Sequence, residues 1–376
     1  MTVLTEKQEQ VLEAYKRLGS HSRVAAELGL AKSTVQEHLA KAARVGHAPG
    51  HFDNGTAHGY FMGKVTVQRR GDTGEVERVW ERQHPQAGHL RQALADAVTG
   101  FKSDIKRAAP EPRPQGTISD LCNLYTFTDY HLGMKAWGKE GGADWDLAIA
   151  ERTLTRAMTA MIAQSPKAHT AVINVQGDFL HTDGKLPLTP ASKHVLDADT
   201  RFPKLRQAAI RLIRGMIAEA LRAHSHVHLI IAEGNHDEES AGWLADLFTV
   251  FYEAEPRLSV NDSQLPFYVF EWGQCMIGVH HGHKVKNEAL PLLFAAQFPQ
   301  AWGRTSRREI HCGHRHHRDE KEYNGVTVVQ HPTLAARDAY AARGGWIAER
   351  AAWAITYHKQ FGAVGRVGVS PEMLAA

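Results

Sequence analysis

At the start of the chain, apolar positions recur with the period of an α-helix. Residues 4–18 carry apolar side chains at spacings of three and four, which predicts one amphipathic helix. A short helix over residues 24–28 and another over residues 33–42 follow, with Gly29 in the turn between them. Two helices joined by a short turn that contains Gly form the helix-turn-helix pattern.

The last of these helices is predicted to begin near Lys32 and to expose polar side chains that can contact bases and phosphates. These candidate DNA contacts are Lys32, Ser33, Thr34, Gln36 and Lys41. Residues 1–46 resemble small helix-turn-helix DNA-binding domains, and the resemblance implies DNA as a partner. The alternative is a plain three-helix bundle that contacts another protein.

Residues 47–116 are predicted to link this domain to the rest of the chain. A Gly- and His-rich loop comes first, and alternating apolar and polar residues on both sides of residues 71–74 then predict a β-hairpin. A helix is expected over residues 88–109, and the Pro-rich residues 110–116 read as an extended linker.

From Ile118 the pattern changes to short β-rich runs alternating with long helical stretches, which predicts an α/β architecture over residues 117–376. Five strand-like runs lead into Gly-bearing loops with metal-ligating residue types: Asp129-Tyr130-His131, Gly177-Asp178, Gly234-Asn235-His236-Asp237, His280–His283 and Gly313–His316. Such residues are expected to collect at one edge of a sheet. Asp129 and His131, two apart on an extended chain, should face the same way. Residues 324–337 and 350–369 are expected to be closing strands of a second sheet.

Composition narrows the choices further. The 376 residues include 44 Lys and Arg against 41 Asp and Glu, so a net charge of +3 makes nucleic-acid binding by bulk charge improbable and any such binding local. The 24 His are the raw material of metal sites, and the 3 Cys, odd in number and far apart, are expected to be core thiols. With no charge-free apolar run near the roughly 18 residues that span a bilayer, we expect a cytoplasmic protein without membrane contact.

The five motifs, in the order D-x-H, G-D, G-N-H-D, H-G-H and G-H-x-H, resemble those of the calcineurin-like metallophosphoesterase superfamily, over residues 118–376. The resemblance implies a four-layer sandwich of two β-sheets flanked by helices, with a two-metal site at the strand ends. It implies three ligands for one ion, Asp129, His131 and His316. It implies three for the other, Asn235, His281 and His314, with Asp178 as the bridging carboxylate.

Ligation by carboxylate, imidazole and amide without thiolate suits two divalent ions, with Mn first and Fe, Zn or Ni as alternatives. His236 resembles the catalytic histidine of the superfamily, and Asp237 is placed in sequence to orient its imidazole. The run Gly177–His181 resembles the G-D-L-F-H motif of SbcD-type repair nucleases, which adds His181 to the candidates. The fourth motif leaves His280 open as an alternative to His281.

Candidate substrate contacts lie outside the motifs. Lys193 and Arg201 follow the second motif and could contact phosphate. Trp137, in a Gly-rich stretch, is a candidate base-stacking residue. A basic rim beside the metals is a further hypothesis, built from Arg304, Arg307, Arg308, Arg315 and Arg318.

The function that these patterns favour is a two-metal phosphoesterase that hydrolyses phosphodiester bonds, directed to DNA by the N-terminal helices. One alternative is a phosphomonoesterase that acts on nucleotides or phosphoproteins. Another is a DNA-binding regulator with an inactive phosphoesterase-like domain. The combination of modules resembles bacteriophage-encoded phosphoesterases.

Overall fold

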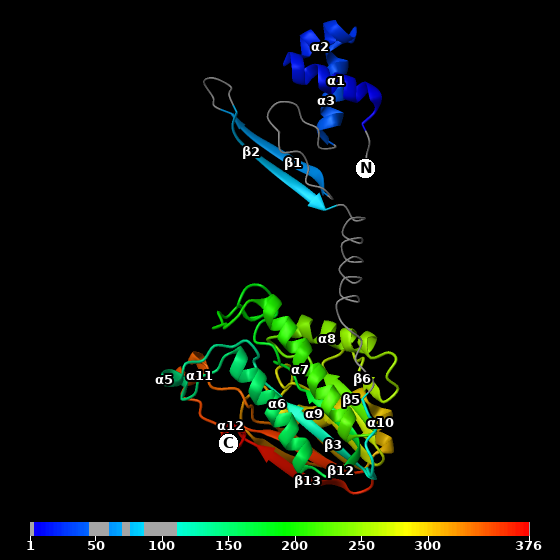
Figure 1. The fold of residues 1–376 in the computed structure, drawn as a ribbon, viewed down its shortest axis with the longest axis vertical. Helices are drawn as coiled ribbons and strands as arrows, with labels where there is room; N and C mark the ends of the chain where they lie inside the picture. The colour runs from blue at the N-terminus through cyan, green and yellow to red at the C-terminus, as the bar shows by residue number, and fades with distance from the viewer. Residues whose placement is uncertain (1–3, 45–59, 70–75, 86–110, 376) are drawn as a thin grey trace. The chain divides into compact units, whose positions relative to one another are not determined.

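The computed structural model describes residues 4–44, 60–69, 76–85 and 111–375 (Figure 1). The chain divides into two compact units, Met1–Arg107 and Ala108–Ala376, so the division falls within the segment predicted as a linker. The predicted loop before the hairpin, the hairpin turn at 71–74 and the whole of the predicted helix over 88–109 lie outside the described residues.

Three helices open the first unit, as predicted: α1 (Glu6–Leu18), α2 (His21–Leu28) and α3 (Lys32–Arg44). Thr5 and Gln8 form a capping box at the start of α1, and Gly29 ends α2 with a φ of 62°, a left-handed conformation that glycine adopts without strain. Val11 and Val35 are among the residues of a small core between the helices. The unit also contains an antiparallel hairpin of β1 (Tyr60–Arg69) and β2 (Val76–Pro85), in agreement with the sequence pattern.

The outward side of α3 carries the residues predicted to contact DNA. Lys32, Ser33, Gln36 and Lys41 are exposed, and Thr34 is partly buried. Lys41 pairs with Glu37 one turn earlier, at 2.7 Å between Nζ and Oε1. These residues are therefore available to a ligand, and their contact with DNA stays a prediction.

The second unit contains two β-sheets. The six-stranded sheet has the order β13-β12-β3-β4-β5-β6. Its strands are β3 (Ile118–Phe127), β4 (Ala168–Val175), β5 (His226–Ile231), β6 (Leu258–Val260), β12 (Ala352–His358) and β13 (Gly362–Val369). The five-stranded sheet has the order β10-β11-β9-β8-β7. Its strands are β7 (Tyr268–Trp272), β8 (Cys275–Val279), β9 (Arg307–Cys312), β10 (Asp319–Tyr323) and β11 (Val326–Gln330).

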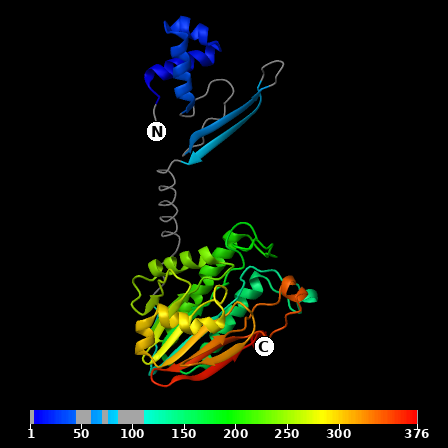
Figure 2. The ribbon, with the colours of Figure 1, turned by 180° about the vertical axis from the view of Figure 1, so that it is seen from behind.

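Helices cover the outer face of each sheet (Figures 1 and 2). The longer helices of the unit are α6 (Leu147–Gln164), α7 (Phe202–Ala223) and α8 (Glu238–Phe251). Its shorter helices are α9 (Leu290–Gln297), α10 (Pro299–Arg304) and α12 (Pro371–Ala375), with α5 (Gly138–Gly141) and α11 (Ala339–Arg343) beside each other at one side of the sandwich. One apolar core joins α6, α7 and α8 to the six-stranded sheet, and another joins α9 and α10 to the five-stranded sheet. A third core, which includes Leu124 and Ile277, lies between the two sheets. This succession of layers confirms the predicted sandwich.

Strand direction determines where the motifs meet. β3, β4, β5 and β6 run parallel, and so do β8, β9 and β11. The expectation that residues 350–369 close the second sheet is wrong, because β12 pairs antiparallel with β3 and carries β13 at the edge of the first sheet. Only β11, from residues 324–337, joins the second sheet.

Two expectations from composition can be compared with the structure. The three cysteines, Cys122, Cys275 and Cys312, are free and buried, as expected of core thiols. Among the helices that the structure describes, none has the length and apolar character needed to cross a bilayer.

Candidate metal centre

All five motifs begin within a few residues of the end of a strand. Asp129 follows β3, Asp178 follows β4, Asn235 follows β5, His281 follows β8 and His314 follows β9. Because these strands are parallel to one another within each sheet, their carboxyl ends bring the five loops to one edge of the sandwich.

The backbone at these loops is unusual. Asp129 and His131 have φ values of 49° and 47°, so they lie in the left-handed region rather than on an extended strand as predicted. Six non-glycine residues in the described parts of the chain have positive φ, and five of them belong to the motifs: Asp129, His131, Asp178, His314 and His316. Residues without glycine's freedom adopt this conformation rarely, and such strain gathers at functional sites.

One group of potential ligands consists of Asp129, His131 and His316. His316 Nε2 lies 3.2 Å from Asp129 Oδ1 and 3.3 Å from His131 Nε2. These are the three residues that the resemblance assigns to one ion, and the structure brings them together.

A second group consists of Asp129, Asp178, His281 and His314. His281 Nε2 lies 3.2 Å from Asp178 Oδ2 and 3.8 Å from Asp129 Oδ1. Asp129 is thus common to both groups, whereas the predicted bridging residue, Asp178, joins only the second. His280 is in neither group, so the geometry favours His281.

Within the described parts of the chain, each of three predicted ligands keeps a buried polar atom without a hydrogen bond. Asp129 Oδ2 accepts from Thr128 Oγ1 at 2.6 Å and from the His314 N–H at 2.8 Å, while Oδ1 has no hydrogen-bond partner. His281 Nδ1 donates to Gln176 O at 2.9 Å, while Nε2 has none. Asn235 Oδ1 is likewise buried and without a partner.

A buried polar atom without a partner destabilises the folded state unless a cation binds to it. An imidazole or carboxylate whose other atom is fixed by the protein is also the usual arrangement of a metal ligand. The residues therefore fit two divalent cations. Burial raises the pKa of Asp129, but the adjacent His316 and His281 together lower it by more than burial raises it. The pKa therefore lies below its usual value, and the group is a carboxylate.

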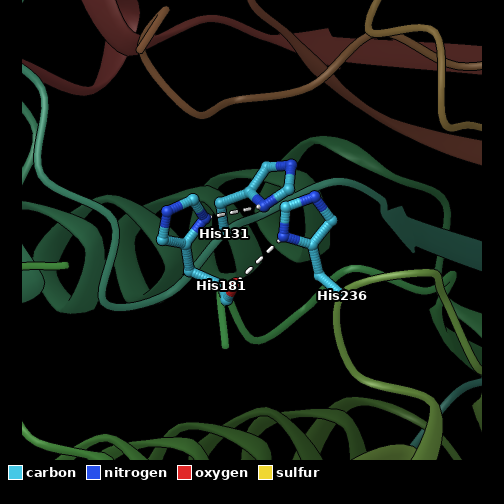
Figure 3. Close-up of side chains that lie close together, drawn as sticks. All are labelled: His131, His181 and His236. Carbon is cyan, nitrogen blue, oxygen red and sulfur yellow. Dashed lines mark hydrogen bonds between the residues drawn. The ribbon is translucent and has the colours of Figure 1, made fainter. Parts of the chain in front are cut away.

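Three histidines, His131, His181 and His236, lie close together in a third group (Figure 3). His236 Nδ1 donates to the carbonyl oxygen of His181 at 3.0 Å, and the His131 ring lies edge-on to the His236 ring at a centroid distance of 4.6 Å. His181 Nδ1 lies 3.2 Å from His131 Nδ1. Burial, with a further contribution from His236, lowers the pKa of His181 to about 3, so His181 is neutral.

Asp237 does not hold the position expected of it. Its Oδ1 accepts from the N–H groups of Asp178 at 3.1 Å and Gly234 at 3.0 Å, and its Oδ2 accepts from the Leu180 N–H at 3.0 Å. The imidazole of His236 is instead oriented by His181 O. Asp237 therefore joins the second and third motifs and fixes the loops that carry Asp178 and Asn235.

Sequence reasoning missed several supporting residues. Asp183, two residues after His181, accepts from the N–H groups of Glu239 and Ser240 at 2.8 Å each and so caps α8. Thr333 Oγ1 donates to Asp129 O at 2.7 Å. The available signal for Asp183 was an acidic residue shortly after the Gly-Asp pair.

Lys193 and Arg201 lie in the segment between β4 and α7, and both side chains are exposed. This segment is fixed to the chain after the first motif, because the Lys135 N–H donates to Asp197 O at 2.7 Å and the Asp199 N–H donates to Gly133 O at 2.8 Å. Within the described part of the chain, no hydrogen bond or ion pair links either side chain to a motif residue, and their contact with substrate stays a prediction.

The predicted basic rim does not form as a unit. Arg307 and Arg308 begin β9, at the end opposite to the loop that holds His314. Arg308 donates to the carbonyl oxygen of Trp302 and stacks on its ring, and Arg304 pairs with Glu271 at 2.7 Å. The reason is strand direction, which carries residues close in sequence to opposite ends of the sheet.

Comparison with solved structures finds matches at low sequence identity. YfcE, a phosphoesterase from E. coli, is 14% identical, with 65% of this chain and 98% of that chain covered and a TM-score of 0.33. Vps29 of Entamoeba histolytica, solved with Zn²⁺, is 15% identical, with coverages of 67% and 99% and a TM-score of 0.29. An archaeal phosphodiesterase is 11% identical, with coverages of 66% and 98% and a TM-score of 0.31.

Comparisons with protein-family models and with curated proteins find no match. The second unit has the layered sandwich that the resemblance implied, with motif residues gathered at one edge of its sheets.

Proposed function

We propose that the second unit is a metal-dependent phosphoesterase that hydrolyses phosphodiester bonds, and that the N-terminal helices direct it to DNA. The observation that supports the chemistry is the meeting of two carboxylates and four imidazoles from separate loops, two of them, Asp129 and His281, with a buried atom left for a cation. When bound, two divalent ions, with Mn as the first expectation, would neutralise the phosphate and activate water for in-line attack.

The chain's own residues supply the proton. Nδ1 of His236 is fixed by His181 O, so Nε2 is the nitrogen free to exchange a proton with substrate. Nε2 of His236 can donate a proton to the leaving oxygen, in the role the resemblance implies. The neutral His181, whose ring is stacked on His236 at 5.5 Å between centroids, keeps that ring in place.

The DNA part of the proposal is supported by the polar, exposed side of α3. Lys32, Ser33 and Gln36 begin the third of three packed helices, in the place where a helix-turn-helix module contacts bases and phosphates. A tethered DNA-binding module raises the local concentration of phosphodiesters at the active site. Diesters are therefore favoured over monoesters as substrates.

The test compares hydrolysis of three substrates by the Mn-reconstituted full chain, with Asp178→Asn as the blank. The substrates are labelled single- and double-stranded DNA, a bis-aryl phosphate diester and an aryl phosphate monoester. We expect cleavage of DNA and of the diester, lost in the blank. Cleavage of the monoester alone would refute the diester assignment, and no cleavage with Mn, Fe, Zn or Ni would refute the enzyme.

A separate measurement tests the N-terminal helices. Exchange of Lys32 and Lys41 for Ala should weaken duplex binding by the full chain and flatten its dependence on salt, because fewer phosphates are contacted. Arg23→Ala serves as a control for loss of a positive charge, since Arg23 is exposed on α2 rather than on α3. Equal binding by all variants at low salt would refute the DNA-directing role.

A further inference from the structure

Two segments that leave the metal centre pack against each other. One follows His131 and contains α5, and the other follows β11 and contains α11; the two helices lie side by side (Figure 1). Arg337 Nε donates to Gly141 O at 3.2 Å, and a Cβ at Gly141 would lie 2.3 Å from Arg337 O. A residue with a side chain could not allow this approach, so the contact between the segments is close.

This pair of segments presents three aromatic side chains to solvent, which we call the aromatic platform. They are Trp137, Tyr340 and Trp346, exposed by 60%, 67% and 57%. The rings of Tyr340 and Trp346 meet edge to face at a centroid distance of 5.2 Å. Several large aromatic side chains exposed on one surface indicate a binding site, because each would be more stable if buried.

The platform lies close to the metal centre along the chain on both sides. Trp137 is six residues after His131, a stretch that can span at most about 20 Å. On the other segment, Thr333 donates to the carbonyl oxygen of Asp129, and Tyr340 is seven residues further on, within about 25 Å. A short strand whose phosphate is held at the metal centre can therefore reach the platform.

The charges around the platform suit a polyanion. Lys139 Nζ lies 5.4 Å from the centre of the Trp137 ring, and Arg337 donates to the carbonyl oxygens of Gly141 and Trp346. Among the described residues, neither cation forms an ion pair with a carboxylate within 4.0 Å. The acidic neighbour Glu140 is paired with Arg343 at 3.4 Å.

Aromatic side chains next to the cationic side chains of Lys139 and Arg337 match the alternation of base and phosphate in a single strand. In a duplex the faces of the bases are stacked and cannot contact the platform. An apolar protein surface would not pair with the cationic side chains. We propose, on the basis of the proposed phosphoesterase function, that the aromatic platform stacks bases of single-stranded nucleic acid next to the scissile phosphate. The substrate class of the metal centre is then single-stranded or locally opened DNA or RNA.

The test measures binding of a labelled single-stranded oligonucleotide to the full chain in the Asp178→Asn background, by fluorescence anisotropy. Trp137→Ala, Tyr340→Ala and Trp346→Ala should each weaken binding by about 10-fold, within the range for one lost base stack. Trp346→Phe should restore most of the loss. The matched control is Phe361→Ala, because Phe361 is 61% exposed in the β12–β13 turn, which lies beside the start of β3 and so at the opposite end of that sheet.

In the active protein, kcat/KM for the oligonucleotide should fall about 10-fold further than kcat/KM for a bis-aryl phosphate diester. The platform would be overturned if the three alanine variants bound the oligonucleotide as tightly as the parent, or if Phe361→Ala lost as much affinity as they do. Equal losses of kcat/KM on both substrates would also overturn it. Failure of the phosphoesterase itself would show as no hydrolysis of either substrate. The binding measurement, which needs no turnover, would still decide whether the platform holds single strands.

Discussion

The position of Asp237 leads to a prediction that separates two roles for this residue. In Asp237→Asn, the amide oxygen can keep the two hydrogen bonds from Asp178 and Gly234, which converge on one carboxylate oxygen. The amide NH₂ must then face the Leu180 N–H, donor against donor. Loss of one hydrogen bond to a charged acceptor in a buried place costs about 1.5–3 kcal/mol.

One effect acts in the other direction. Burial and the negative charge of Asp178 raise the pKa of Asp237 to about 7, so removal of the charge relieves some repulsion. We expect a net loss of about 2 kcal/mol, which corresponds to a fall in Tm of about 4–8 °C for a domain of this size. Metal affinity should fall by about 10-fold or more, because the loops carrying Asp178 and Asn235 loosen.

The assay is thermal unfolding by circular dichroism, with metal content measured on the same samples. Asp246→Asn is the matched control, because Asp246 is an exposed carboxylate on α8, the helix that begins directly after Asp237. Its Tm should stay within about 1 °C of the parent, as usual for surface changes. If Asp237→Asn kept its Tm and metals but lost turnover as His236→Ala does, Asp237 would be an orienting partner of the imidazole and our reading of the hydrogen bonds would be wrong.

Further predictions concern the ligands, the loops and the pH dependence of stability. Asp178→Asn should lower the metal content per chain, whereas His236→Ala should keep it and reduce kcat about 100-fold or more; equal metal loss in both would contradict the role given to His236. Gly234→Ala should abolish activity, because its Cβ would lie 2.1 Å from Asp178 Oδ1, while Gly242→Ala on α8, with no atom within 4 Å, should fold normally; an active Gly234→Ala would refute this. Burial lowers the pKa of His224 to about 4, so the unfolded chain takes up this proton first as the pH falls below about 6.5. The contribution of His224 to the free energy of unfolding is therefore present above that pH and is lost towards pH 4, with about 2 kcal/mol lost at pH 5. The urea midpoint of His224→Gln should change less between pH 7 and pH 5 than that of the parent.

The positions of the motifs could be predicted from the sequence because they depend on local signals. An apolar run that ends at a Gly-bearing loop marks the carboxyl end of a buried strand, and parallel strands end at the same edge. This is why Asp129, Asp178 and His314 meet although they lie far apart in the chain. The order of the motifs carried the same information in the form of a family resemblance.

The direction of individual side chains could not be predicted in this way. Asp237 adjoins His236 in sequence, yet its carboxylate points to the loop of Asp178. The reason is that it accepts hydrogen bonds from backbone N–H groups of that loop, about 60 residues earlier in the chain. Alternation along a strand also failed for Asp129 and His131, whose left-handed backbone places both side chains at the site by another route. Both errors have one cause, since contacts between distant loops decide the conformation at a loop.

The same contacts explain why the site depends on so much of the fold. Asp237 fixes the second motif to the third, Thr333 fixes the chain after β11 to the first, and Asp129 accepts the N–H of His314 from the fifth. In Asp129, one carboxylate oxygen accepts from the protein, and the other is left for a cation. Because the loops hold one another, a change in any of them moves ligands on the others, and the arrangement of the metal centre is a property of the whole sandwich edge rather than of any single motif.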